Sequence, residues 1–210
     1  MLRILRSIFW LMFLFAANSA PALATETILV MGDSLSAGYG IAKEQSWPAL
    51  LSVRLHAEKF DYGMVNLSIS GETSAGGRAR LPAALKTHRP AVVILALGAN
   101  DGLRGLPLAQ MRENLASMIR QSQSHKARVL LVGMRLPPNY GAEYEAQFAA
   151  VYAELARQYK VALLPFLFEG FAEQRAAFQA DGLHPTAATQ PLMLENVWPV
   201  LKPLLKRPGR

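Results

Sequence analysis

The stretch Ala91-Val92-Val93-Ile94-Leu95-Ala96-Leu97 is apolar at every position. A strand that helices cover on both faces has this composition, whereas a half-exposed strand alternates apolar and polar residues. The stretch runs directly into Gly98-Ala99-Asn100-Asp101, where glycine, asparagine and aspartate favour a turn. The sequence therefore predicts a buried strand within a sheet that carries helices on both sides.

Four other short apolar runs predict further strands: Thr27–Met31, Gly63–Ile69, Arg128–Gly133 and Val161–Phe166. Longer amphipathic segments between and after them predict helices: Trp47–Lys59, Ala75–Thr87, Leu108–Ser124, Glu143–Tyr159 and Ala187–Leu201. Strict alternation of strands and helices predicts an α/β fold with a mainly parallel sheet and right-handed crossovers. No repeat, low-complexity tract or linker interrupts the pattern, so we expect a single domain.

Composition excludes several classes of protein. The chain has 210 residues, of which 51% are hydrophobic, 18% are charged and none is cysteine. This length suits one domain, and this composition excludes intrinsic disorder. Without cysteine there is no disulfide framework, cysteine-ligated zinc, iron–sulfur cluster or thiol nucleophile. The H-E-x-x-H, Walker and G-x-G-x-x-G motifs are absent from the sequence, so we expect neither a metal nor a cofactor.

Residues 1–24 have the organisation of a secretory signal peptide. Arg3 and Arg6 precede the apolar run Ile8–Ala17, and Ala22-Leu23-Ala24 is a small-x-small cleavage site. An uncleaved membrane anchor is the alternative. However, the apolar run is ten residues long, and a spanning helix needs ~20. We therefore expect a mature domain over residues 25–210, located in the periplasm or secreted.

Charge gives little evidence for a macromolecular partner. The formal net charge is +7, but two basic residues belong to the leader, and four lie in a C-terminal tail: Lys202, Lys206, Arg207 and Arg210. The remaining body is near neutral and has no basic stripe with interleaved aromatics, so we expect no nucleic acid partner. The tail is either a solvated terminus or a transient contact with an anionic membrane surface. We expect a monomer.

Two segments at the ends of the chain contain a candidate nucleophile and a candidate base. Ser34 follows the first predicted strand, where a serine is either a helix N-cap or a nucleophile. Asp181 lies three residues before His184, and at that spacing a carboxylate in a turn can orient an imidazole toward a serine. The alternative is an Asx-turn with both side chains solvated. The other three histidines lie on amphipathic helices among charged residues, and we expect them to be solvated.

Two further residues are candidates for stabilising a negatively charged oxygen. Gly71 has no Cβ, so its backbone N–H can approach a ligand closely. The side-chain amide of Asn100 can donate to a developing oxyanion, although asparagine and aspartate after a strand are also ordinary turn residues. We expect the neighbouring Asp101 to hold its loop. With the backbone N–H of Ser34, these groups form a candidate oxyanion hole.

Taken together, these blocks resemble the SGNH hydrolase family, also called the GDSL esterases and lipases. The matching blocks are Gly32-Asp33-Ser34, Gly71, Gly98-Ala99-Asn100-Asp101 and Asp181-Gly182-Leu183-His184. The resemblance implies that Ser34, Asp181 and His184 are catalytic and that Ser34, Gly71 and Asn100 form the oxyanion hole. It also implies a single-domain, three-layer α/β/α fold with a five-stranded parallel sheet in the flavodoxin-like order 2-1-3-4-5.

Within that family, the chain is similar to the periplasmic multifunctional thioesterase I, lysophospholipase and arylesterase group. The stretches that carry this likeness are Met31–Tyr39, Asn66–Ser74, Gly98–Gly105, Arg135–Gly141 and Asp181–Pro185. Glu72 and Ala99 depart from the pattern, which leads us to expect Asp and Gly there. The likeness implies a serine esterase acting on aryl esters, acyl esters, lysophospholipids and acyl thioesters. A carbohydrate O-acetylesterase and a non-catalytic binding module are the alternatives.

Loops at the same rim contain candidates for an acyl-binding groove. These residues are Leu103, Leu106, Leu136, Pro137 and Tyr140. The alternative is that some of them only pack in the core, because apolar residues are found most often there.

Overall fold

Five parallel strands form the centre of the structure, a computed structural model that describes residues 25–206. The strands are β1 (Glu26–Gly32), β2 (Tyr62–Asn66), β3 (Val92–Ala96), β4 (Arg128–Val132) and β5 (Ala162–Leu164). Their order in the sheet is β2-β1-β3-β4-β5, and every neighbouring pair is parallel. The strand order implied by the resemblance is therefore confirmed. The leader lies outside the described residues, as do Arg207 and Arg210.

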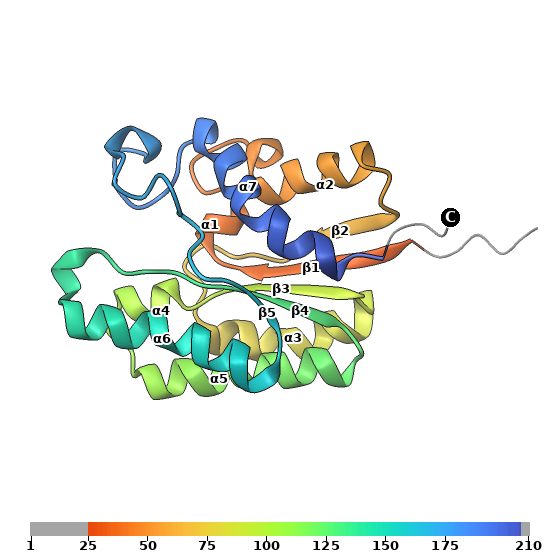
Figure 1. Ribbon diagram of the computed structural model, residues 1–210, viewed down its shortest axis with the longest axis horizontal. Helices are drawn as coiled ribbons and strands as arrows, with labels where there is room; N and C mark the ends of the chain where they lie inside the picture. The colour runs from red at the N-terminus through yellow and green to blue at the C-terminus, as the bar shows by residue number, and fades with distance from the viewer. Residues whose placement is uncertain (1–24, 207–210) are drawn as a thin grey trace, which may run out of the picture.

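Helices cover both faces of the sheet (Figure 1). One face carries α1 (Ser34–Ala37), α2 (Trp47–Ala57) and α7 (Gln190–Leu201). The other face carries α3 (Ser74–His88), α4 (Ala99–Leu103), α5 (Leu108–Ser124) and α6 (Ala142–Tyr159). This arrangement confirms the three-layer α/β/α prediction. Across residues 25–206, no helix combines the length and the apolar character that crossing a membrane requires.

The apolar stretch around Ile94 is the central strand β3, which is buried along its whole length. Side chains from both helical layers pack against the sheet, with Trp47 and Leu51 from α2 on one face and Phe148 from α6 on the other. Burying a large apolar side chain contributes about 1.5–3 kcal/mol. Two-sided burial therefore explains why this strand has no polar position.

The main differences from the sequence prediction concern short elements. The helices α1 and α4 have four and five residues, too few for a helical periodicity to show. The last helix begins at Gln190, because Ala187–Thr189 forms a separate 3₁₀ turn. The strand β2 ends at Asn66 rather than at Ile69, yet the Ile69 N–H still donates to the Gly32 carbonyl at 3.1 Å. That hydrogen bond keeps the segment after β2 beside the end of β1.

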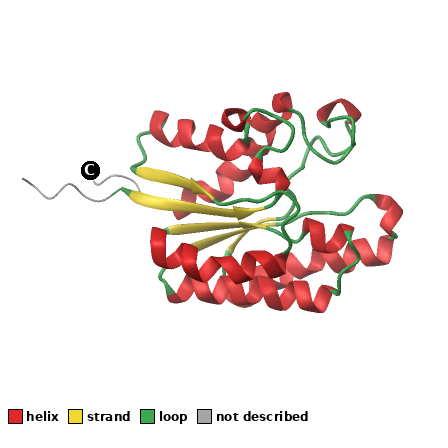
Figure 2. Cartoon of the chain, turned by 180° about the vertical axis from the view of Figure 1, so that it is seen from behind, coloured by secondary structure: helices red, strands yellow, loops and turns green. Residues whose placement is uncertain are grey.

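All five strands point toward one edge of the sheet, where the irregular segments gather (Figure 2). Ligands of open α/β sheets bind beyond the carboxyl ends of the strands. The candidate site residues Ser34, Gly71 and Asn100 follow β1, β2 and β3 in that order. The fold therefore brings together segments that lie far apart in the sequence.

Candidate active site

Ser34 is the first residue of α1, directly after β1. Asp33 is the N-cap of this helix, because its Oδ1 accepts a hydrogen bond from the Leu35 N–H at 3.0 Å. The alternative reading of Ser34 as the N-cap is therefore wrong. Its Oγ lies 2.9 Å from Nε2 of His184, a distance at which the hydroxyl can donate to the imidazole.

Asp181 uses its two carboxylate oxygens in different ways. Its Oδ1 accepts the N–H groups of Leu183 at 2.9 Å and of His184 at 3.0 Å, which makes an Asx-turn. Its Oδ2 lies 2.7 Å from Nδ1 of His184. The backbone donors His184 and Leu183, followed by the ring, lower the pKa of Asp181 to about 2. The carboxylate is therefore charged at neutral pH. The Asx-turn of the alternative is present, but the Asp181 and His184 side chains are hydrogen-bonded to each other.

The imidazole of His184 is supported by groups that the sequence did not single out. The ring of Tyr39 lies against it with centroids 4.4 Å apart. Gln179 donates from its backbone N–H to the His184 carbonyl at 2.8 Å. Its Nε2 donates to the carbonyls of Tyr39 at 2.8 Å and of Pro185 at 3.1 Å. These bonds connect the turn that carries His184 to the loop after α1.

Asn100 reaches the segment that contains Gly71. Its Nδ2 donates to the carbonyl of Glu72 at 3.0 Å and lies 3.4 Å from Oδ2 of Asp33. Gly71 has a φ of +79°, a conformation that glycine adopts without strain. Ser34 and Asn100 line the same cavity, and Gly71 is joined to Asn100 through the adjacent residue Glu72. The structure therefore gathers the three candidate oxyanion residues around the end of β1.

Two buried carboxyl groups lie beneath this site. Burial raises the pKa of Asp33 from its ordinary 3.8 to about 7. Asp101 accepts the Ser74 hydroxyl with Oδ1 at 2.5 Å and the Ser74 N–H with Oδ2 at 2.8 Å. Because Asp101 belongs to α4 and Ser74 begins α3, this pair fastens the two elements together. The expectation that Asp101 holds its loop agrees with this geometry.

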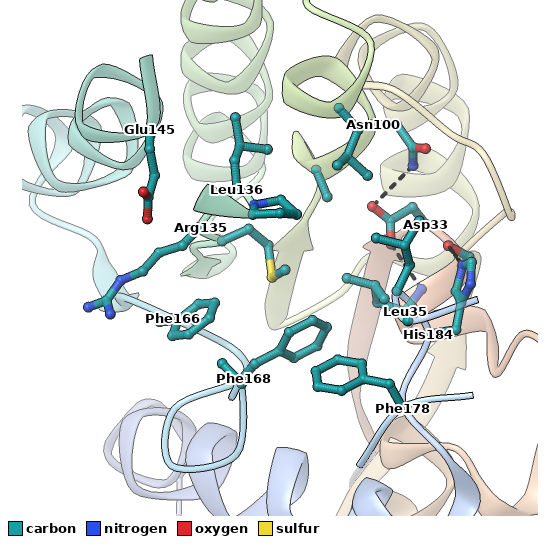
Figure 3. A pocket seen from close by; sticks show the side chains of 18 of the residues that line it. Asp33, Leu35, Asn100, Arg135, Leu136, Glu145, Phe166, Phe168, Phe178 and His184 are labelled. Carbon is teal, nitrogen blue, oxygen red and sulfur yellow. Dashed lines mark hydrogen bonds between the residues drawn. The ribbon is translucent and has the colours of Figure 1, made fainter. Parts of the chain in front are cut away.

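A cavity of about 420 Å³ extends from the Ser34–His184 pair (Figure 3). Asn100 and His184 lie toward one end, and Arg135 and Glu145 toward the other. Apolar side chains line the space between them, including Phe166, Phe168 and Phe178. Such a cavity suits an apolar group attached to a reactive centre held near Ser34.

Three of the five candidate groove residues line this cavity: Leu103, Leu136 and Pro137. Tyr140 does not line it; its hydroxyl donates to the Leu103 carbonyl at 3.0 Å. Leu106 does not line it either; it lies beyond the end of α4 with 37% of its surface exposed.

Sequence reasoning missed the phenylalanine wall after β5. Phe166 was predicted as the end of the strand Val161–Phe166, which stops at Leu164, and Phe168 and Phe178 come from a segment with short turns but no long helix or strand. No periodicity therefore marked this wall. The dense aromatic composition of Pro165–Phe171 (PFLFEGF) was the available signal. Across residues 25–206, no group of three or more His, Asp or Glu side chains has the arrangement of a metal site.

Comparison with known proteins identifies the family. A model of the GDSL-like lipase/acylhydrolase family matches residues 30–191, a range that contains all four sequence blocks. The chain belongs to this family. In this GDSL-like hydrolase, the hydrogen-bonded side chains of Ser34, His184 and Asp181 all lie within the matched range.

Curated relatives of this GDSL-like hydrolase are esterases and thioesterases. Esterase TesA of Pseudomonas aeruginosa is 54% identical over 182 residues, which cover 87% of this chain and 90% of the relative. An arylesterase of Vibrio mimicus is 44% identical over 184 residues, covering 88% and 92%. Thioesterase 1/protease 1/lysophospholipase L1 of Escherichia coli K12 is 42% identical over 184 residues, covering 88% and 87%.

The fold of the GDSL-like hydrolase also agrees with solved structures. The crystal structure of a TesA protein superimposes with a TM-score of 0.84 at 54% sequence identity. The match covers 86% of this chain and 100% of the other. The chain is thus a hydrolase with the α/β/α fold of its family.

Proposed function

We propose that this GDSL-like hydrolase is a serine esterase for acyl and aryl carboxylic esters, including lysophospholipids, and for acyl thioesters. The observation that carries the proposal is the hydrogen-bonded series Asp181, His184 and Ser34 at one end of an apolar cavity. The named activities of the relatives support the substrate class, since they include esterase, arylesterase, thioesterase and lysophospholipase.

Acylation begins when Ser34 Oγ attacks the acyl carbonyl carbon. His184 Nε2 accepts the hydroxyl proton, and the charged Asp181 stabilises the imidazolium that forms. The carbonyl oxygen becomes negatively charged in the tetrahedral intermediate. The backbone N–H groups of Ser34 and Gly71 and the Nδ2 of Asn100 are the proposed donors to that oxygen.

Collapse of the intermediate then releases the alcohol or thiol. His184 returns its proton to the leaving oxygen or sulfur, and the acyl group stays on Ser34 as an ester. A water molecule next attacks this ester while His184 accepts one of its protons. Release of the carboxylic acid restores the Ser34 hydroxyl, so the chain's own residues carry every proton transfer.

The cavity favours acyl chains over acetyl groups alone. Its lining between Ser34 and Arg135 is mostly apolar, with Leu136, Phe166 and Phe168 among the side chains. Each methylene that the cavity buries in the transition state contributes about 0.8 kcal/mol, or about fourfold in kcat/KM. We therefore expect kcat/KM to rise with acyl length until the chain fills the cavity.

The decisive experiment measures hydrolysis of p-nitrophenyl esters from acetate to palmitate, with lysophosphatidylcholine and palmitoyl-CoA as further substrates. Wild type is compared with Ser34→Ala and with Ser52→Ala, a control at an exposed position of α2. The proposal predicts medium- or long-chain activity that only Ser34→Ala abolishes. Activity confined to acetate would instead favour the O-acetylesterase alternative, and folded but inactive wild type would exclude esterase function.

We propose in addition that the enzyme is exported after cleavage at Ala24. The support is the charged, apolar and small-residue pattern of residues 1–24, which lie outside the described residues. Mass spectrometry of the protein from a periplasmic fraction should find Thr25 as the first residue. Full-length protein in the membrane fraction would show that the leader is retained as an anchor.

Contact of the C-terminal tail with an anionic membrane stays a prediction. In the described part of the tail, the ammonium groups of Lys202 and Lys206 form ion pairs with Glu58 at 2.7 Å and with Glu26 at 2.8 Å. A membrane would have to compete with these carboxylates for the two lysines.

A further inference from the structure

The direction of the Gly71 N–H depends on a four-residue turn. The turn Ile69–Glu72 is closed by the Glu72 N–H, which donates to the Ile69 carbonyl at 3.1 Å. Gly71 is its third residue and has a φ of +79°, as a type II turn requires. In a type I turn the peptide before the third residue is flipped, so its N–H points to the other side. Gly71 therefore serves as an oxyanion donor only while this turn keeps its shape.

Arg104 holds this turn from outside. Its Nη2 donates to the Gly71 carbonyl at 2.9 Å. Arg104 is the residue that ends α4, and its backbone N–H donates to the carbonyl of Asn100 at 3.2 Å. The five-residue helix α4 begins next to Gly98, so one short element carries Asn100 at its start and the guanidinium that binds Gly71 at its end.

A second arginine contacts Glu72, the last residue of the same turn. Arg80 of α3 lies 2.6 Å from the Glu72 carboxylate and donates to the Leu67 carbonyl at 3.1 Å. The carbonyl of Glu72 in turn accepts from Asn100. Arg80 thus anchors the residue that orients Asn100, whereas Arg104 contacts Gly71 itself.

We propose that Arg104 is a positioning residue for the oxyanion hole, which fixes the turn at Gly71 relative to Asn100. The inference rests on the proposed function, because it assigns the Gly71 N–H to the oxyanion. Oxyanion donors accelerate a reaction when they already point at the site of the developing charge. Without the guanidinium, the peptide after Gly71 loses its hydrogen bond to Arg104, so the Gly71 conformation that sets the direction of its N–H is no longer held from outside the turn.

The test uses p-nitrophenyl butyrate, a neutral substrate that offers no anionic group to an arginine. Arg104→Gln should lower kcat about 10–100-fold, less than the loss of a donor, because the donor is misplaced rather than removed, and leave KM within twofold. Affinity for an alkyl boronic acid, which forms a tetrahedral oxyanion adduct with serine, should fall in parallel with kcat/KM. Arg104→Lys should recover part of kcat, because an ammonium can still donate to the Gly71 carbonyl.

Arg120→Gln is the matched control. Arg120 is another exposed arginine; it binds Glu113 and the Tyr159 hydroxyl on the helices α5 and α6. The Arg120→Gln variant should keep wild-type kcat and boronate affinity. All variants should keep the far-UV circular dichroism spectrum of wild type. Unchanged kcat in Arg104→Gln would overturn the proposal, and so would a rise in KM alone, which would assign Arg104 to substrate binding. Since wild type and Ser34→Ala are assayed alongside, a failure of the esterase function itself shows separately as inactive wild type.

Discussion

Nδ2 of Asn100 donates to the backbone carbonyl of Glu72 at 3.0 Å, and this bond joins the segments that follow β2 and β3. An amide nitrogen carries two hydrogens, and Nδ2 also donates to Oδ2 of Asp33 at 3.4 Å, the longer of its two hydrogen bonds. Because the bond to Glu72 fixes rotation of the amide, the second hydrogen has a defined direction before any substrate binds. Asn100 is thus oriented by the protein itself.

Replacing Asn100 with alanine should therefore lower kcat about 10²–10³-fold while KM changes little, since one oxyanion donor is lost. Steady-state kinetics on p-nitrophenyl butyrate measures both parameters. Asn196→Ala is the control, because the Asn196 side chain of α7 likewise makes two hydrogen bonds, to the carbonyls of Leu167 and Glu169, but does not line the cavity. Equal losses of kcat in the two variants would contradict a catalytic role for Asn100.

The pair of Asp101 and Ser74 predicts an effect on stability. In Asp101→Ala the Ser74 N–H loses its acceptor in a buried place, and the Ser74 hydroxyl loses one partner. We expect a loss of about 3 kcal/mol, and a Tm lowered by about 6–12 °C. Thermal unfolding followed by circular dichroism tests this. The control Glu113→Ala removes an exposed ion pair with Arg120 and should leave the Tm close to that of wild type, because exposed ion pairs contribute little to stability.

Asp33 predicts a pH dependence of stability. Burial raises its pKa from its ordinary 3.8 to about 7, so the folded protein holds this proton more tightly than the unfolded chain. The resulting stabilisation is fully present below pH 3.8 and is lost as the pH rises through about 7. Asp33→Asn cannot ionise, so wild type should lose stability relative to this variant between pH 4 and about 8.

Urea unfolding at several pH values measures that difference. The asparagine side chain can still accept a hydrogen bond from the Leu35 N–H, so the variant keeps the N-cap of α1. The pH dependence of the stability difference then reports ionisation of Asp33. A stability difference between the two proteins that stays constant from pH 4 to about 8 would show that Asp33 does not titrate in this range.

The cavity predicts how to change acyl-length preference. Ala172 lines it and is exposed, so Ala172→Phe can project a large apolar ring into it without disturbing the core. We expect the optimum of kcat/KM to move to shorter p-nitrophenyl esters, with activity on acetate within twofold of wild type. Ala83→Phe, at an exposed position of α3, should keep the wild-type profile. Identical profiles for Ala172→Phe and wild type would place the acyl chain elsewhere.

Much of the fold could be predicted because its cause is local. Ile94 and its neighbours are apolar since both faces of β3 are covered, and this pattern can be read without the structure. The same holds for the proximity of Asp181 and His184, which are three residues apart in one turn. Chain connectivity alone brings them within reach.

The remainder depends on contacts between distant segments. Arg104 and Gly71 are separated by 33 positions, and no local pattern marks their hydrogen bond. Tyr39 and His184 likewise come into contact only when the loop after α1 packs against the turn Asp181–His184. Tyr140 was a reasonable groove candidate by position, but the direction of its hydroxyl is set by the Leu103 carbonyl. Side-chain direction of this kind follows from the assembled fold.

The turn that carries His184 and Asp181 has a consequence for thermal inactivation. Many of its hydrogen bonds are internal, such as those from Gly182 and His184 to Gln179 and Asp181, whereas Ser34 adjoins the end of the buried strand β1. Local unfolding of this turn would separate the imidazole from the serine while leaving the sheet intact. Warming should therefore reduce turnover reversibly at temperatures where the circular dichroism of the sheet is unchanged. That result would show that this exposed turn, rather than the sheet, limits the temperature at which the enzyme turns over.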